Sequence, residues 1–368
     1  MRFLGRTGLM TMALVGGLLH GVVAQRQRIT VSSNVGVELV NALQVQISPE
    51  FLPDSAADPA LFRTTRLMRL SYNYFAPFRN HAAVQRTRWL TEKIGTGVYL
   101  LPLFYTDSPQ PRRVTPVSAP ILAAIHSHPD SAARIADNYM ELVGQFGRDA
   151  NFAQFRRRYR YVYELALAET RRNLPAAAFI ATLEQYYGAS KAGYRIIVNP
   201  FFKAEWGMSW QVATPAGPVA YQIAAPMQEQ VVQQGHVVQA GFDNAAAVRN
   251  LSVHEFGHSF VNPLTGQPAI AARLAAQAAL FRPVPGQGQY RDWETLFNEH
   301  LVRAGEIRVA LALGQQAVAE QLRTEYAAWM YLPFFEQQLQ RYEANRQQYP
   351  SLEAFLPDLL TAVDALPR

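Results

Sequence analysis

One short segment restricts the fold of this chain more than any other feature. Residues 251–263 read LSVHEFGHSFVNP, so His254 and His258 stand four residues apart. In a helix, residues with this spacing lie on one face about one turn apart, and both imidazoles can then point at one ion. We expect Phe256 to face away from that ion, into the core. The segment therefore predicts a packed helix with a metal-binding face.

Glu255 adds the chemistry of hydrolysis to this helix. Zinc lowers the pKa of a bound water to roughly 7, and a carboxylate beside it can take the proton as the water attacks a carbonyl. We therefore expect Glu255 to be the general base. Gly257 costs a helix about 1 kcal/mol relative to alanine, which indicates that another part of the chain approaches closely there. Pro263 predicts that the helix ends near Asn262.

A catalytic zinc ion needs three protein ligands and an open position, so a third ligand must follow the motif. The extended form HExxHxxGxxH is excluded, because Val261 and Leu264 stand where its glycine and third histidine would be. The next suitable segment is YRDWETLFNEHLVRAGE, which predicts a helix. We favour Glu299 of its Asn-Glu pair as the third ligand, and Glu294 and His300 remain alternatives.

Hydrolysis of a carbonyl also needs a hydrogen-bond donor for the oxyanion that develops in the transition state. Tyrosine and histidine side chains can fill this role. The candidates near the expected ligands are Tyr290, His300, Tyr326 and Tyr331. Spacing alone does not choose among them.

Two other histidine positions need a separate interpretation. His126 and His128 stand two residues apart, a spacing found at some metal sites, but the following Pro129 and Asp130 predict a turn into a helix. His81 lies at a predicted helix start, where we expect a capping or packing role. Asn80 is the predicted cap of that helix.

The N-terminus has the pattern of a secretory signal peptide. Arg2 and Arg6 precede a short apolar run that ends in small residues at Val22 and Ala24, and the run is too short to span a bilayer. Residues 1–24 therefore predict a signal peptide and a secreted or periplasmic protein, with an uncleaved N-terminal anchor as the alternative. No later segment predicts a membrane span.

Composition limits the remaining possibilities. The chain has no cysteine, so disulfide frameworks and thiolate metal sites are excluded, and any metal must be held by histidine and carboxylate. The net charge of +6 is small for 368 residues. The densest basic cluster, residues 155–172, interleaves arginine with tyrosine. Its apolar residues recur at helical spacing, which favours an amphipathic helix with a solvated basic face over a nucleic-acid site.

The order of predicted elements gives the fold class. A short strand and a helix open the mature chain, and helical patterns dominate as far as residue 190. The run at 96–105 predicts a buried strand or helix end. Short β-branched and aromatic runs between residues 193 and 242 predict strands, and helices follow from Asn244 to the end. We expect a helix-dominant α+β zincin-like domain over 25–368, with a helical part at 25–190 and a metal-site part at 191–368.

These motifs resemble known families. A helical HExxH followed by a glutamate on a later helix resembles the gluzincin zinc metallopeptidases, whose third ligand often lies in an Asn-Glu pair. The segment HEFGHSFVNP more closely resembles a bacterial family of secreted proteins that is described only as a domain of unknown function. Looser similarity covers VGVELVNAL, FAPFRNHAAV, NEHLVRA and the segment from YLPFFEQ to FLP, and so nearly the whole mature chain.

The resemblance implies zinc held by His254, His258 and Glu299, with Glu255 as base, and it implies no substrate. Arg303 stands where thermolysin-like enzymes have an acid, so we expect the surroundings of the ligands to differ from theirs. A secreted zinc peptidase acting on peptides or proteins is the leading hypothesis. The alternatives are a catalytically idle zincin-fold binding protein and a zinc hydrolase of non-peptide amides or esters.

Overall fold

The computed structural model describes residues 29–47, 64–176, 178–288 and 290–366. It is α+β and dominated by helices, which confirms the predicted fold class. The predicted signal peptide, residues 1–24, lies outside the described residues.

The first half contains β1 (Ile29–Ser32), α2 (Val35–Ile47), α3 (Arg66–Phe75), η3 (Ala76–Phe78), α4 (Ala82–Ile94), η4 (Gly95–Phe104), α5 (Ala119–Ile125), α6 (Pro129–Asp149), α7 (Phe152–Arg158), α8 (Arg160–Arg172) and α9 (Phe179–Tyr187). The second half contains β2 (Gly193–Val198), β3 (Gly207–Thr214), β4 (Gly217–Ala224), β5 (Val231–Gln233), β6 (His236–Gln239), α10 (Ala245–Thr265), α11 (Pro268–Ala276), η5 (Ala278–Leu280), α12 (Trp293–Ala312), α13 (Gln316–Glu325), α14 (Leu332–Ala344) and α15 (Leu352–Asp364).

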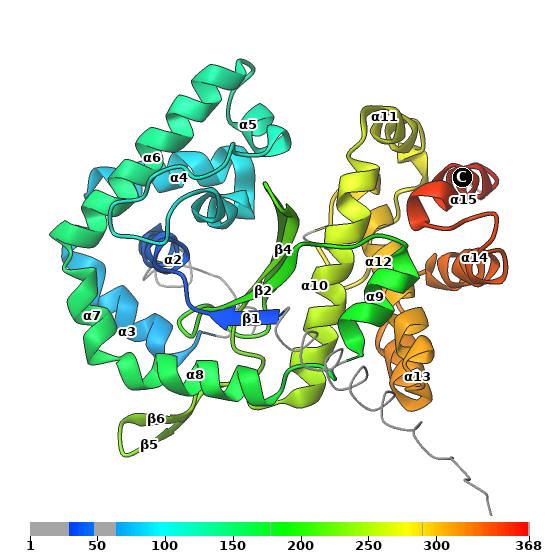
Figure 1. Cartoon of the computed structure of the whole chain (residues 1–368). Coiled ribbons are helices and arrows are strands. Elements are labelled where there is room, and N and C mark those ends of the chain that lie inside the picture. The colour runs from blue at the N-terminus through cyan, green and yellow to red at the C-terminus, as the bar shows by residue number, and fades with distance from the viewer. Residues whose placement is uncertain (1–28, 48–63, 177, 289, 367–368) are drawn as a thin grey trace, which may run out of the picture.

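A small sheet lies in the middle of the molecule. Its strand order is β1-β2-β4-β3, in which β1, β2 and β4 are parallel and β3 runs antiparallel along one edge. Figure 1 shows the N-terminal helices on one side of the sheet and α10 on the other, with α12, α14 and α15 beyond α10. Because β1 comes from the first part of the chain and pairs with β2, the two predicted parts share one sheet.

Helices α10 and α12, which carry the predicted metal ligands, each begin at a residue whose side chain caps the helix. The Asn244 side chain accepts a hydrogen bond from the backbone N–H of Ala247 at 3.0 Å, which starts α10 at the predicted position. Asp292 caps α12 in the same way, by accepting from the backbone N–H of Thr295 at 2.8 Å. Each cap satisfies a backbone donor that the first helical turn leaves without a partner.

Helix α10 runs past Pro263 to Thr265, so the predicted end near Asn262 is wrong. Proline removes the hydrogen bond that would otherwise reach back to the carbonyl of Ser259. The buried Lys191 ammonium donates to that carbonyl at 2.8 Å and takes the place of the missing N–H. A side chain far away in sequence therefore allows the helix to continue.

Two further local predictions need correction. Residues 95–104 form the 3-10 helix η4, neither a strand nor the end of an α-helix, and Pro102 inside it cannot donate to a longer helical or strand ladder. The cap of α4 is His81, whose Nδ1 accepts from the backbone N–H of Ala83 at 3.0 Å, and Asn80 is not the cap. The expected capping role of His81 is confirmed.

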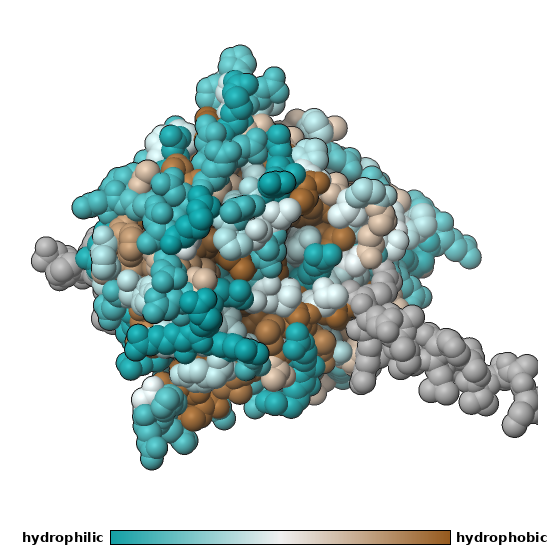
Figure 2. Space-filling view, turned by 60° about the vertical axis from the view of Figure 1, so that its left-hand side comes forward, coloured by the Kyte–Doolittle hydropathy of each residue, from teal (hydrophilic) through white to brown (hydrophobic). Residues whose placement is uncertain are grey.

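The surface of the N-terminal half is mainly hydrophilic. Figure 2, turned to bring this side forward, shows hydrophobic residues only in small patches between polar ones. This is the pattern expected of amphipathic helices that bury their apolar faces. In the described part of the chain, no helix has the length and apolar character needed to cross a bilayer.

Candidate metal centre

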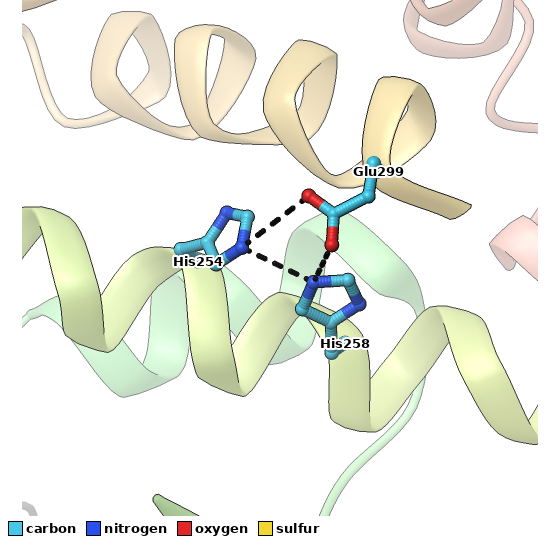
Figure 3. Close-up of side chains that lie close together, drawn as sticks. All are labelled: His254, His258 and Glu299. Atoms are coloured by element: carbon cyan, nitrogen blue, oxygen red, sulfur yellow. Dashed lines mark hydrogen bonds and ion pairs between the residues drawn. The ribbon is translucent and has the colours of Figure 1, made fainter. Parts of the chain in front are cut away.

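Three side chains converge between α10 and α12. His254 and His258 come from α10 and Glu299 comes from α12, and Figure 3 shows all three directed into the space between the helices. The Nε2 atoms of the two histidines are 3.2 Å apart. The Glu299 carboxylate lies 3.4 Å from His258 Nε2 through Oε1 and 3.7 Å from His254 Nε2 through Oε2. Of the three predicted third ligands, Glu299 is therefore the one that joins the histidines.

These distances fit a single ion. Ligand atoms about 2.0–2.1 Å from a tetrahedral zinc ion lie roughly 3.4 Å from one another. The three donor atoms in this group are imidazole nitrogens and a carboxylate oxygen, the ligand types of catalytic zinc sites. The group could therefore hold a divalent metal ion of the size of zinc without rearrangement of the helices.

The charges around this group also favour a cation. Three glutamates are buried here: Glu255 is 5% exposed, Glu299 8% and Glu306 2%. Among the described side chains in contact with these carboxylates, Arg303 is the one permanent cation. Buried charges are costly unless they are balanced, so three carboxylates and one guanidinium leave the centre short of positive charge. A divalent ion would supply it.

The lack of positive charge around the carboxylates is also reflected in the pKa values of His258 and Glu299. Burial by itself would lower the pKa of His258, but the contact with Glu299 raises it to about 9. Burial would likewise raise the pKa of Glu299, yet His258, His254 and Arg303 together hold it well below its ordinary value. The carboxylate is thus kept ionised and directed at the histidines, as a metal ligand must be.

Glu306 orients His254 by contacting Nδ1, the ring nitrogen that does not face Glu299. Its Oε1 lies 2.6 Å from His254 Nδ1, and its Oε2 accepts a hydrogen bond from the Tyr326 hydroxyl at 2.9 Å. A carboxylate on Nδ1 fixes that nitrogen as the donor and leaves Nε2 free to bind an ion. On the other histidine, His258 Nδ1 lies 3.1 Å from Asn262 Oδ1. Sequence reasoning missed Glu306, although its position two helical turns after Glu299 places both on one face of α12.

Two glycines and a tyrosine set the distance between α10 and α12. A Cβ atom added to Gly305 on α12 would lie 2.5 Å from the Tyr187 hydroxyl, and one added to Gly257 on α10 would lie 3.3 Å from it. The Tyr187 ring also stacks on Phe260 of α10 with centroids 4.8 Å apart. The close approach that Gly257 predicted is confirmed, and it is made by Val302 of α12, whose Cγ1 would lie 3.2 Å from the added Cβ, together with Tyr187 of α9.

Glu255 lies against strand β3. A Cβ atom added to Gly207 would be 2.8 Å from Glu255 Oε1 and 2.8 Å from Leu251 Cδ1, so a larger residue there would displace one or both of these side chains. Burial raises the pKa of Glu255, an effect that the two histidines and Ser209 of β3 partly offset. The glutamate predicted to be the base is thus buried beside the metal group and next to the edge strand of the sheet.

The two alternative ligands do not reach this group. Glu294 is exposed at the start of α12. His300 is fully buried, with Nδ1 2.8 Å from the Leu296 carbonyl and Nε2 3.4 Å from the backbone N–H of Tyr331. Burial lowers the pKa of His300 to about 4, so it is a neutral core histidine.

The expected oxyanion donors fall into two groups. His300 and Tyr331 are engaged elsewhere, since the nitrogens of His300 are occupied as described and the Tyr331 hydroxyl donates to the Leu280 carbonyl at 2.7 Å. Tyr326 is engaged with Glu306. Tyr290 is half-buried and packs edge-on against Trp329, and its role as a donor stays a prediction.

The remaining histidines lie away from the metal group. His126 and His128 are exposed, with ring centroids 5.6 Å apart, and the backbone N–H of His128 donates to His126 Nδ1 at 3.0 Å. Within the described residues they join no cluster of metal-ligating side chains. His81 lies 3.3 Å from Asp149 in addition to capping α4.

Comparison with known proteins identifies a family but no characterised relative. Neither the curated proteins nor the solved structures include a match to this chain. One family model matches residues 124–362, which contain the whole of α10, α12 and the metal group. The chain therefore belongs to the family described as a domain of unknown function, DUF4932.

Proposed function

We propose that this protein is a zinc-dependent metallopeptidase of the gluzincin type, exported through the signal peptide predicted at residues 1–24. The observation that carries the proposal is the convergence of His254, His258 and Glu299 beside a buried glutamate, Glu255. Two helix-borne histidines, a glutamate from a second helix and an adjacent carboxylate are the parts that metal-assisted hydrolysis requires.

The residues of the chain would divide the chemistry as follows. His254, His258 and Glu299 would hold zinc, which when bound supplies Lewis acidity to a substrate carbonyl and to water. Glu255 would take a proton from the attacking water and deliver it to the leaving amine. Burial raises the pKa of Glu255, which makes its carboxylate a stronger base. Glu306 and Asn262 would keep the two imidazoles aimed at the ion.

Strand β3 favours a peptide substrate over a small ester or amide. It forms one edge of the four-stranded sheet, and its Gly207 lies against Glu255. An edge strand presents backbone N–H and C=O groups that can pair with an extended peptide. A substrate that pairs in this way would pass directly in front of the base.

A peptide library tests the proposal. The purified zinc-loaded protein should cleave peptides, a chelator should abolish cleavage, and zinc should restore it. Glu255→Gln should bind zinc but lose about 10²–10⁴-fold in rate, because it cannot accept the proton. Glu294→Gln is the matched control, since this exposed glutamate lies on the same helix as Glu299 but outside the group.

The alternatives predict other results. Zinc binding without cleavage of any peptide or ester would favour an idle binding protein. Cleavage of esters or small amides but of no peptide would favour a non-peptide hydrolase. Equal peptide cleavage by wild type and Glu255→Gln would contradict the assignment of the base.

A further inference from the structure

Arg303 has an unusual place beside the metal group. It follows Glu299 by one helical turn, and its Nη2 donates to Glu299 Oε2 at 3.1 Å. Its side chain is only 13% exposed, and the carboxylate it contacts is 10% exposed. A buried cation thus binds directly to the carboxylate that would also bind the metal ion.

Two aromatic rings fix the guanidinium in this position. Its central carbon lies 4.6 Å from the ring centroid of Tyr326 and 4.3 Å from that of Trp329. The Tyr326 hydroxyl donates to Glu306, which contacts His254. Tyr326 therefore joins the group that orients His254 to the group that orients Glu299. Because an arginine held between rings has little freedom to turn away, its hydrogen bond to Glu299 is a fixed part of the centre.

Fold stability does not account well for this arrangement. Arg303 Nε is buried with no hydrogen-bond partner among the described residues. A buried donor that lacks a partner costs about 1–3 kcal/mol, and more when the group is charged. An apolar side chain would fill the space between Tyr326 and Trp329 without that cost but would leave Glu299 without its cationic partner, so the effect of the Arg303 charge lies at Glu299.

The two carboxylate oxygens of Glu299 have different partners. Oε2 accepts the hydrogen bond from Arg303, whereas Oε1 is the oxygen nearer to His258 Nε2. A carboxylate that donates electron density to a guanidinium has less to give to a metal ion, and a fixed positive charge nearby repels a dication. Both effects act against tight metal binding and leave a bound ion more electron-poor.

We propose that Arg303 is a positioning residue that restricts Glu299 to binding a metal ion through one oxygen. In this position Arg303 lowers the affinity of the centre for the ion, so that a bound ion keeps more of its Lewis acidity. The proposal rests on the metal site of the proposed function but not on peptide cleavage. It predicts that removal of Arg303 strengthens metal binding, whereas removal of an ordinary supporting residue weakens it.

Metal titration of the purified full-length protein tests this directly. Zinc affinity is measured by competition with a chelating dye, and the coordination of cobalt(II), used in place of zinc, is read from its visible absorption. Arg303→Met should bind zinc roughly tenfold more tightly, a change of the size usual for groups behind metal ligands but of the opposite sign. Its cobalt absorption should weaken, as expected when the freed Oε2 raises the coordination number.

Arg303→Lys is the matched control, because it keeps the charge and should keep the wild-type affinity within about threefold, well inside the range of supporting-residue effects. Arg303→Gln, which is also neutral, serves for the same measurements if the methionine variant does not fold. Weaker zinc binding by the neutral variant, or unchanged affinity and cobalt spectrum, would overturn the proposal. Failure of the wild type to bind any metal would instead refute the metal site itself.

Discussion

Two buried glutamates on opposite sides of the sheet have pKa values that are shifted in opposite directions. Glu38 on α2 is fully buried and contacts Arg156 at 2.9 Å, with Tyr163 beside it, and burial raises its pKa to about 8 although Arg156 opposes the rise. Glu299 on α12 is buried almost as deeply and also contacts an arginine that lies against a tyrosine. Its pKa is nevertheless held well below the ordinary value.

The difference lies in the other neighbours. Glu38 has one cationic partner, and Asp107 nearby adds to the cost of its charge, so burial prevails. Glu299 has three neighbours that lower its pKa against the effect of burial: His258, His254 and Arg303. An arginine paired with a buried glutamate therefore does not distinguish a structural pair from a functional centre. What distinguishes them is the presence of further ligand atoms that converge on the carboxylate.

The same substitution at the two positions should separate them most strongly. Glu299→Gln should abolish stoichiometric zinc binding, because an amide is a poor metal ligand and the charge of the carboxylate is lost. Glu38→Gln should leave zinc content unchanged, since at neutral pH glutamine copies a carboxyl group that is largely protonated. Metal analysis of both variants checks this. Equal loss of zinc in the two variants would contradict the distinction between Glu38 and Glu299.

Removal of the carboxylate behind His254 should have a smaller effect. Glu306→Gln keeps the shape and a hydrogen-bond acceptor for His254 Nδ1 but loses the negative charge. We expect zinc affinity to fall about 10–100-fold while the ligand set stays complete. Dye competition measures the change. Affinity equal to that of the wild type would show that Glu306 has only a packing role.

The spacing of α10 and α12 can be tested without touching a ligand. Gly305→Ala would place a methyl group against the Tyr187 hydroxyl, and the strain should destabilise the fold by about 1–3 kcal/mol. Tyr187→Phe in the same chain removes the hydroxyl and should recover much of that loss. Denaturant unfolding of the two single variants and the double variant gives the coupling. Additive losses would mean that Tyr187 does not set the spacing.

The last expected effect is a pH dependence of stability that belongs to Glu38. Its pKa in the folded protein, about 8, lies above the ordinary value of 4.5, so it contributes stability at low pH that is lost as pH rises toward and through 8. Glu38→Gln lacks this titration. Its stability relative to the wild type should therefore increase between pH 6 and pH 9, as followed by urea unfolding at constant ionic strength. A parallel decline of both proteins would show that Glu38 ionises normally.

Much of the centre could be predicted from the sequence because its chemistry depends on local spacing. His254, Glu255 and His258 follow from one helical turn, and Glu299 from the Asn-Glu pair of a later helical segment that carries suitable ligands. The α+β class followed from short β-branched runs set between helical patterns. These features depend on residues close together in the chain, where periodicity is informative.

The remaining features depend on contacts between distant segments. Glu306 acquires its role from the rotation of α12 against α10, and Tyr187 reaches both helices from α9. The continuation of α10 past Pro263 depends on Lys191, far away in the sequence. His300 was a reasonable ligand by spacing but faces the core, because adjacent residues on a helix point in different directions.

We expect the buried group between α10 and α12 to hold one divalent ion. The most direct test is the metal content of the purified wild-type chain after incubation with zinc and removal of excess, measured by elemental mass spectrometry beside Glu299→Gln. We expect one tightly bound zinc ion per wild-type chain, removable by a chelator, and none in the variant. Zinc at the same low level in both proteins would contradict it.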